Sequence, residues 1–266
     1  MKLFISADIE GTAGIVNWSE TEYGKDGYEY FRRQMTREVS AACEAALSID
    51  EHSTIIVKDA HDSARNILPE MLPKNTRLFR GWAKHPFCMM YGLDETFAGV
   101  SLTGYHSAAG MNTNPLAHTR NTKAYKVSLN GETCPEALIN SLTASYLGVP
   151  VLAITGDKGV CDYMQTRFPQ ILTVPVNEGA GSGVMSLHPD TAVDFIRETA
   201  EKALAQAKDI PCIPLPEHFC FEVNYIKHFD AYSASFYPGA VQLDEKTVRF
   251  ESCDWMDVLR FIHFAL

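Results

Sequence analysis

The sequence comprises 266 residues, of which 46% are hydrophobic, and it carries a formal net charge of −10. This length suits one large domain, or one large domain with a smaller appendage. The negative charge and the lack of a cluster of Lys and Arg argue against a nucleic acid or an anionic membrane surface as a partner. No apolar run approaches the roughly 18 residues of a membrane span, and the N-terminus does not read as a signal peptide.

The cysteines indicate a reducing environment. There are seven of them, an odd number, and no two form a C-x-x-C pair. This pattern argues against a disulfide framework and against a structural zinc knuckle. Reduced thiols are typical of the cytoplasm, so we expect a cytoplasmic protein.

Strands and helices are predicted to alternate along the first 210 residues. Apolar or alternating runs predict strands at 3–7, 53–58, 78–79, 97–105, 125–129, 149–154 and 171–176. Apolar residues at helical spacing predict helices at about 31–46, 136–147 and 189–208. Such alternation is typical of a three-layer α/β/α fold with a mainly parallel sheet.

Three prolines at 211, 214 and 216 mark a boundary. The residues after them predict the order strand, helix, strand, helix, with a turn at Pro238-Gly239. We therefore predict an α/β domain at 1–210 and a smaller α+β domain at 211–266. A segment inserted earlier in the chain could also form part of the smaller domain.

Candidate metal ligands follow the predicted strands. Asp8 and Glu10 come directly after the first strand, His61 follows the strand at 53–58, and His106 follows the strand at 97–105. Glu136 stands at a predicted helix start. Because ligands of open α/β sheets bind beyond the carboxyl ends of the strands, these side chains predict a metal site, and a shared carboxylate would allow two metals.

Each candidate also has a purely structural interpretation. Asp8, Glu10 and Asp157 could cap helices, and the histidines could be ordinary surface or core residues. Glu136 completes a T-x-x-E pattern that is typical of a capping box. The glycine-rich stretch 179–183 lacks the Lys and the spacing of a phosphate-binding loop, so we interpret it as a flexible loop.

The ordered set of motifs resembles the M55 family of D-aminopeptidases, also called the dipeptide transport protein family. The motifs are Asp8-Ile9-Glu10-Gly11, Asp59-Ala60-His61, Gly104-Tyr105-His106, His118-Thr119, and Asn130-Gly131 followed by Glu136. The similarity runs through nearly the whole chain. It departs from the family at Pro135, where Gly is usual, and at 177–183, which lacks the basic residues of some relatives.

The resemblance implies a dizinc aminopeptidase that hydrolyses short peptides, such as D-Ala-D-Ala, by a metal-bridged hydroxide. It implies that Asp8 bridges the two ions, that Glu10 and His61 complete one zinc site, and that His106 and Glu136 complete the other. His118 matches a catalytic histidine that is not a ligand. Mn²⁺ or Co²⁺ would also suit these ligands. The family is cytoplasmic and forms ring-like homo-oligomers, here expected to be homodecamers.

Two other functions remain open at the level of the residues. A metal-dependent phosphoesterase also uses clustered Asp and His ligands on an α/β sheet, although few basic residues lie near these motifs. A non-catalytic peptide-binding protein would bind peptides tightly without turnover.

Overall fold

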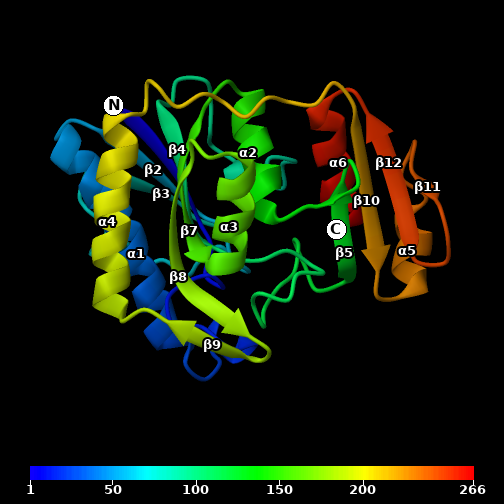
Figure 1. Ribbon diagram of the computed structural model, residues 1–266, viewed down its shortest axis with the longest axis horizontal. Helices are drawn as coiled ribbons and strands as arrows, with labels where there is room; N and C mark the ends of the chain where they lie inside the picture. The colour runs from blue at the N-terminus through cyan, green and yellow to red at the C-terminus, as the bar shows by residue number, and fades with distance from the viewer.

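The computed structural model describes residues 1–266 and contains two sheets (Figure 1). The larger sheet has the strand order β3-β2-β1-β4-β7-β8-β9. Its strands are β1 (Lys2–Ala7), β2 (Thr54–Asp59), β3 (Thr76–Phe79), β4 (Gly99–Tyr105), β7 (Val151–Asp157), β8 (Leu172–Ala180) and β9 (Gly183–Ser186). Only β9 is antiparallel to its neighbour. The chain runs outward in both directions from β1 and β4, so the topological switch point lies between these two strands.

Helices cover both faces of the large sheet. The helices α1 (Tyr28–Ile49) and α4 (Pro189–Ala205) pack together on one face, and α2 (Glu136–Tyr146) and α3 (Lys158–Arg167) lie on the other (Figure 1). In β1, Leu3 and Ile5 belong to the core beneath α1 and α4, whereas Phe4 belongs to the core on the opposite face. Successive side chains of a strand point to opposite faces, so β1 is buried on both. The predicted three-layer fold is confirmed.

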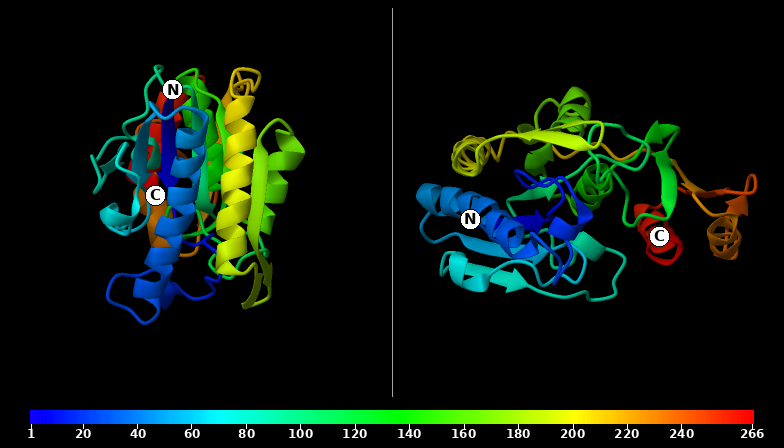
Figure 2. Two further views of the ribbon diagram at one scale, coloured as in Figure 1. Left: turned by 90° about the vertical axis from the view of Figure 1, so that its left-hand side faces the viewer. Right: turned by 90° about the horizontal axis from the view of Figure 1, so that it is seen from below.

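The smaller sheet is antiparallel and lies to the side of the large sheet, away from α1 and α4 (Figure 2). Its order is β11-β12-β10-β5-β6. These strands are β5 (Ala124–Leu129), β6 (Glu132–Thr133), β10 (Phe219–Tyr225), β11 (Val241–Gln242) and β12 (Thr247–Ser252), and they are accompanied by α5 (His228–Ala234) and α6 (Trp255–Ala265). The division near residue 210 stays a prediction, and the small sheet takes two strands from before it.

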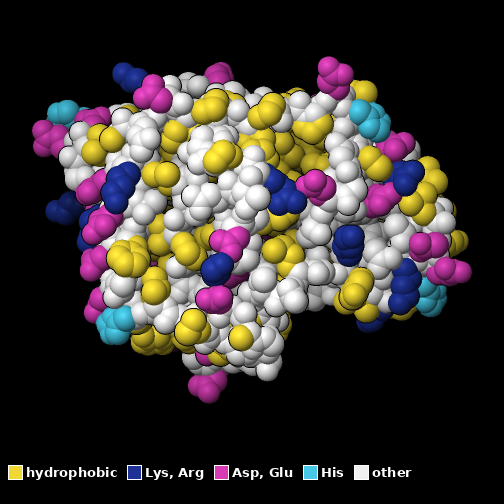
Figure 3. All heavy atoms as spheres, viewed as in Figure 1, with side chains coloured by type: hydrophobic (Ala, Val, Ile, Leu, Met, Phe, Trp, Pro, Cys, Tyr) yellow, Lys and Arg dark blue, Asp and Glu magenta, His cyan; other side chains and the backbone are white.

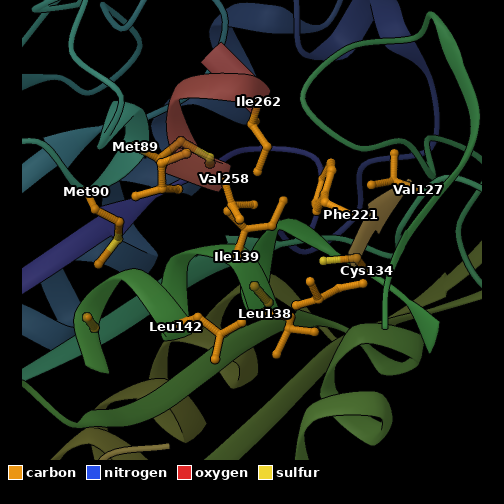
Figure 4. Close-up of a cluster of buried hydrophobic side chains, with 14 of the residues drawn as sticks. Met89, Met90, Val127, Cys134, Leu138, Ile139, Leu142, Phe221, Val258 and Ile262 are labelled. Atoms are coloured by element: carbon orange, nitrogen blue, oxygen red, sulfur yellow. The ribbon is translucent and has the colours of Figure 1, made fainter. Parts of the chain in front are cut away.

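Helix α2 joins the two sheets through a shared core (Figure 4). Its Ile139 belongs to the same buried cluster as Val258 of α6 and Phe221 of β10, and all three side chains are fully buried. The indole of Trp255 donates a hydrogen bond of 3.1 Å to Oγ1 of Thr143 on α2. Burying one such apolar side chain contributes about 2 kcal/mol, so this cluster fixes the start of α2 relative to both sheets.

Three local predictions differ from the structure. Helix α3 was not predicted, although the interpretation of Asp157 as a helix cap is confirmed: it is the N-cap of α3 and accepts a hydrogen bond of 2.9 Å from the amide of Val160. The stretch 179–183 is not a loop: it comprises the end of β8, a tight turn at 181–182 and the first residue of β9. Glu136 forms no capping box, because the N-cap of α2 is Pro135 and no side chain caps it. Among the helices, none has both the length and the apolar character that crossing a membrane requires.

Candidate metal centre

The structure brings all five predicted ligands together at the switch point. Asp8 and Glu10 follow β1, His61 follows β2, His106 follows β4, and Glu136 is the first residue of α2. All five are buried, and His61, the most exposed of them, is only 7% exposed. The convergence that the sequence predicted is therefore present, and it places five polar side chains where the surrounding protein excludes most water.

Glycines allow the loop of Asp8 to lie directly on the end of β4. The amide of Asp8 donates a hydrogen bond of 2.8 Å to the carbonyl of Thr103, and the amide of Gly11 donates one of 2.9 Å to the carbonyl of Gly104. A Cβ at Gly11 would overlap the carbonyl oxygen of Tyr105. Gly104 also has a φ of 72°, which favours glycine. Both glycines are thus needed to hold the two ligand-bearing segments in contact.

The two carboxylate oxygens of Asp8 face different histidines. Oδ1 lies 3.4 Å from Nδ1 of His61, which is also 3.1 Å from Oε2 of Glu10. Oδ2 lies 3.6 Å from Nε2 of His106, which is also 3.5 Å from Oε1 of Glu136. The side chains thus form two groups of potential ligands, Asp8 with Glu10 and His61, and Asp8 with His106 and Glu136. Asp8 is common to both groups.

Each histidine of the cluster is oriented by a backbone carbonyl. Nε2 of His61 donates to the carbonyl of Thr21, Nδ1 of His106 to that of Ser107, and Nδ1 of His118 to that of Leu116, each at 2.9 Å. A carbonyl oxygen only accepts, so in the neutral imidazole the other ring nitrogen carries a lone pair. In all three cases that nitrogen faces the carboxylates, as it does in metal-ligating histidines.

His118 lies at the same cluster but at longer range. Its Nε2 is 3.8 Å from Oε1 of Glu10 and 3.8 Å from Oε1 of Glu136. Its ring stacks on that of His106 at 4.1 Å and meets the ring of Trp18 edge-on at 5.2 Å. His118 also forms a third potential ligand group with Glu10 and His106, so its predicted role outside the ligand set stays a prediction.

The electrostatics of the cluster show a site that holds protons when no cation is bound. Burial and the charge of Glu10 raise the pKa of Asp8 to about 8. Burial opposes the charged form of His106, but the adjacent carboxylates of Glu136, Glu10 and Asp8 raise its pKa to about 10. Burial and the positive charge of His106 lower the pKa of His118. Protons offset the repulsion between carboxylates here, and bound cations would replace them.

The residues present fit divalent metal ions. Oε2 of Glu10 and Nε2 of His106 are buried and have no hydrogen-bond partner, which is costly unless a ligand satisfies them. Carboxylate oxygens and imidazole nitrogens are the usual ligands of catalytic zinc. The two groups that share Asp8 have the same members as the two predicted ion sites.

The side chains of the cluster, all except His106, line a cavity of about 450 Å³. Trp18 and Trp82 also line the cavity. The sequence did not identify them as site residues, because an aromatic residue in a predicted loop has no pattern that indicates a function. Arg120 also lines the cavity and was likewise missed. Its proximity to His118, two residues away, was the only available hint.

The fold and the site define an α/β protein with a buried candidate metal centre at the switch point of a mainly parallel sheet. Comparison with protein families identifies it further. The chain belongs to the peptidase M55 family, described as D-aminopeptidase, whose model matches residues 1–264. The resemblance found in the sequence is thereby confirmed.

The chain is similar to Bacillus subtilis D-aminopeptidase in both sequence and fold. A D-aminopeptidase of Bacillus subtilis (strain 168) is 28% identical over 259 residues, which cover 97% of this chain and 93% of the relative. The solved structure described as the Zn-dependent D-aminopeptidase DppA from Bacillus subtilis, a self-compartmentalizing protease, superposes with a TM-score of 0.91 at 26% identity. The match covers 100% of this chain and 98% of that structure. The smaller sheet therefore belongs to the shared fold.

Proposed function

We propose that this protein is a zinc aminopeptidase that removes the N-terminal residue from short peptides containing D-amino acids, and that it binds two ions. The single observation that carries the two-ion proposal is the division of five buried side chains into two groups that share Asp8. Family membership and the Zn-dependent D-aminopeptidase relative support the activity and the metal. Glu10 and His61 would complete one ion site, and His106 and Glu136 the other.

The reaction adds water across a peptide bond. The bond from the carbonyl carbon to nitrogen breaks, the water oxygen bonds to that carbon, and the leaving nitrogen gains a proton. Two bound zinc ions would supply Lewis acidity, lowering the pKa of water and polarising the carbonyl. The protein must hold the ligands in place, exclude bulk water and move the proton.

His118 is the candidate for moving the proton. Nδ1 of His118 donates to the carbonyl of Leu116, so in the neutral imidazole Nε2 is free to accept a proton on the cavity side. The same nitrogen can then return the proton to the leaving amine or donate to the developing oxyanion. The T-shaped contact with Trp18 holds the ring in this orientation.

Carboxylates in the cavity suit a substrate with a free amino group. Glu22 and Asp62 line the cavity in addition to the candidate ligands. Trp82 forms an apolar wall beside them, and its indole donates a hydrogen bond of 2.7 Å to the carbonyl of Asp62. A positively charged amino terminus is attracted to this acidic side, which favours an aminopeptidase over a phosphoesterase.

We propose a cytoplasmic homo-oligomer, ring-like and decameric. The relative described as self-compartmentalizing supports assembly, and the seven free cysteines support a reducing compartment. Helix α5 and its end expose a row of aromatic residues, with Phe229, Tyr232 and Phe236 exposed by 55%, 60% and 69%. Apolar side chains also lie at the end of the molecule formed by β11 and β12 (Figure 3). Such patches are typical of interfaces.

The activity can be tested with purified protein, its zinc content and paired peptides. We expect two zinc ions per chain and cleavage of D-Ala-D-Ala well above that of L-Ala-L-Ala. Asp8→Ala should lose both ions and all activity, whereas Asp162→Ala, at an exposed ion pair, should keep both. A fully metal-loaded protein that cleaves neither peptide, or one that instead cleaves nitrophenyl phosphate, would overturn the proposal. Loss of one ion in Asp8→Ala would show that Asp8 does not bridge.

A further inference from the structure

Asp157 holds the segment 107–118, which ends at His118, although Asp157 itself does not line the metal cavity. It is the last residue of β7, and its side chain is fully buried. Its Oδ1 accepts a hydrogen bond of 2.6 Å from Oγ of Ser107, and its Oδ2 accepts one of 2.9 Å from Nδ2 of Asn114. The carboxylate therefore ties the beginning of this segment to a point near its end.

Asn114 passes this restraint on to His118. Its Oδ1 accepts a hydrogen bond of 2.8 Å from the amide of Leu116, two residues further on, which closes an Asx turn. The carbonyl of Leu116 in turn accepts the hydrogen bond of 2.9 Å from Nδ1 of His118. A chain of three hydrogen bonds thus joins the buried carboxylate of Asp157 to the imidazole.

Ser107 connects the same segment to the candidate ligand His106. Its carbonyl accepts a hydrogen bond of 2.9 Å from Nδ1 of His106 and one of 3.2 Å from the backbone amide of His118. Both the amide and the hydroxyl of Ser107 donate to the carboxylate of Asp157. The spacing between His106 and His118 is therefore set by one residue, which Asp157 holds at two points.

Two glycines let the segment 107–118 pack directly against its neighbours. A Cβ at Gly159, in the first turn of α3, would lie 2.0 Å from Oγ1 of Thr113 and 2.5 Å from Oγ of Ser107. A Cβ at Gly179, in β8, would lie 2.4 Å from the carbonyl oxygen of Thr113. These separations are far shorter than van der Waals contact, so close packing restrains the middle of the segment as well.

The hydrogen bond to Leu116 decides which atoms of the His118 ring face the candidate metal site. Stacking on His106 at 4.1 Å fixes the plane of the ring, but turning the ring by 180° would keep that plane and exchange Nε2 with a carbon atom. With Nδ1 on the carbonyl of Leu116, Nε2 is directed at Glu10 and Glu136. The place of that carbonyl thus controls both the orientation and the tautomer of the imidazole.

We propose that Asn114, anchored by Asp157, is a positioning residue that holds His118 for proton transfer. The inference rests on the proposed function and adds a residue to its proton-transfer step. Without the side-chain oxygen of Asn114, the turn opens and the carbonyl of Leu116 loses its fixed place. The imidazole then samples other orientations, and only a fraction of the molecules present Nε2 to the substrate. Misplacement of a reacting group by about 1 Å can cost about 100-fold in rate.

The test is Asn114→Ala, measured for zinc content and for kcat and KM on D-Ala-D-Ala. We expect an unchanged zinc content, a KM within a few fold of the wild type, and a loss of about 10- to 100-fold in kcat. Asn114→Ser restores an oxygen that can accept from the amide of Leu116, so it should recover part of the loss. The control is Asn75→Ala, which removes an exposed side chain that donates to the carbonyl of Glu51 and should keep the kcat of the wild type.

A double-mutant cycle separates the positioning of His118 from a general loss of structure. In a His118→Ala background, Asn114→Ala should cost less than about twofold in kcat, because the group that Asn114 positions is already gone. An equal cost in both backgrounds, or loss of zinc in Asn114→Ala, would overturn the inference and leave the aminopeptidase activity intact. Zinc-loaded wild-type protein that cleaves neither D- nor L-peptides would overturn the proposed function, and the inference with it. Should Asn114→Ala not fold, Asn114→Ser takes its place in the cycle, and there a kcat equal to that of the wild type would overturn the inference.

Discussion

Glu38 makes the stability of this protein depend on pH in a predictable direction. It lies in α1 with 0% exposure, and its Oε1 accepts hydrogen bonds of 3.0 Å from the amide of Ala13 and from Nε2 of Gln34. Its Oε2 has no partner. Burial raises the pKa of Glu38 from 4.5 to about 7, against the lowering effect of those two hydrogen bonds. The carboxyl group is therefore more stable in its neutral form inside the folded protein.

The sign and size of the effect follow from this shift. Because the folded-state pKa lies above the unfolded-state value, the stabilisation is complete below pH 4.5 and is lost as the pH rises through 7. Each pKa unit corresponds to about 1.4 kcal/mol, so ionisation of Glu38 costs about 3 kcal/mol at pH 8.5 and about 1 kcal/mol at pH 5. Glu38→Gln has the same shape and cannot ionise.

The variant should thus gain stability over the wild type as the pH rises. We expect the difference in the free energy of unfolding to grow by about 2 kcal/mol in favour of Glu38→Gln between pH 5 and pH 8.5. Urea unfolding of both proteins in the same buffers measures it, and other titrating groups cancel in the difference. In Glu38→Gln the nitrogen of the new side-chain amide has no hydrogen-bond partner. This lowers the free energy of unfolding by the same amount at every pH, so it does not affect the change with pH. A difference that did not change with pH would refute the reasoning.

Three further predictions concern other parts of the molecule. His118→Ala should keep both zinc ions but lose about two to four orders of magnitude in kcat, and loss of zinc would instead make His118 a ligand. Asp157→Ala should lower the free energy of unfolding by about 3 kcal/mol or more, because this buried carboxylate accepts four hydrogen bonds. The control Asp162→Ala, at an exposed ion pair, should cost less than about 1 kcal/mol, and equal losses in urea unfolding would contradict this. Phe236→Glu should reduce the mass of the oligomer in light scattering, and an unchanged mass would exclude this surface from the interface.

The sequence predicted the convergence of the five candidate residues because four of them follow buried strands. Apolar runs such as those before Asp8 and His106 are recognisable without a structure, and parallel strands bring their carboxyl ends to one edge. Helix α3 was missed because only a short apolar stripe, including Val160 and Met164, marks it, and Gly159 weakens the helical signal.

The sequence could not reveal which residues pair over long distances. The antiparallel pairing of β5 with β10 joins segments about ninety residues apart, and only the folded chain shows it. Arg120 was missed for a related reason, since its burial depends on a left-handed backbone conformation and on contacts with α2. A charged residue in a loop is most often solvated, so the sequence around Arg120 predicts an exposed side chain and not a buried one.

The pairing of β5 with β10 also limits how this protein can be divided or recombined. Strand β5 lies inside the small sheet, between β10 and β6, and the hairpin that it forms with β6 leads directly into Glu136. A fragment ending near residue 210 would leave β5 as an open edge and free the start of α2. The small sheet is therefore not a detachable module. A functional chimera between relatives would have to exchange residues 124–133 together with the C-terminal segment.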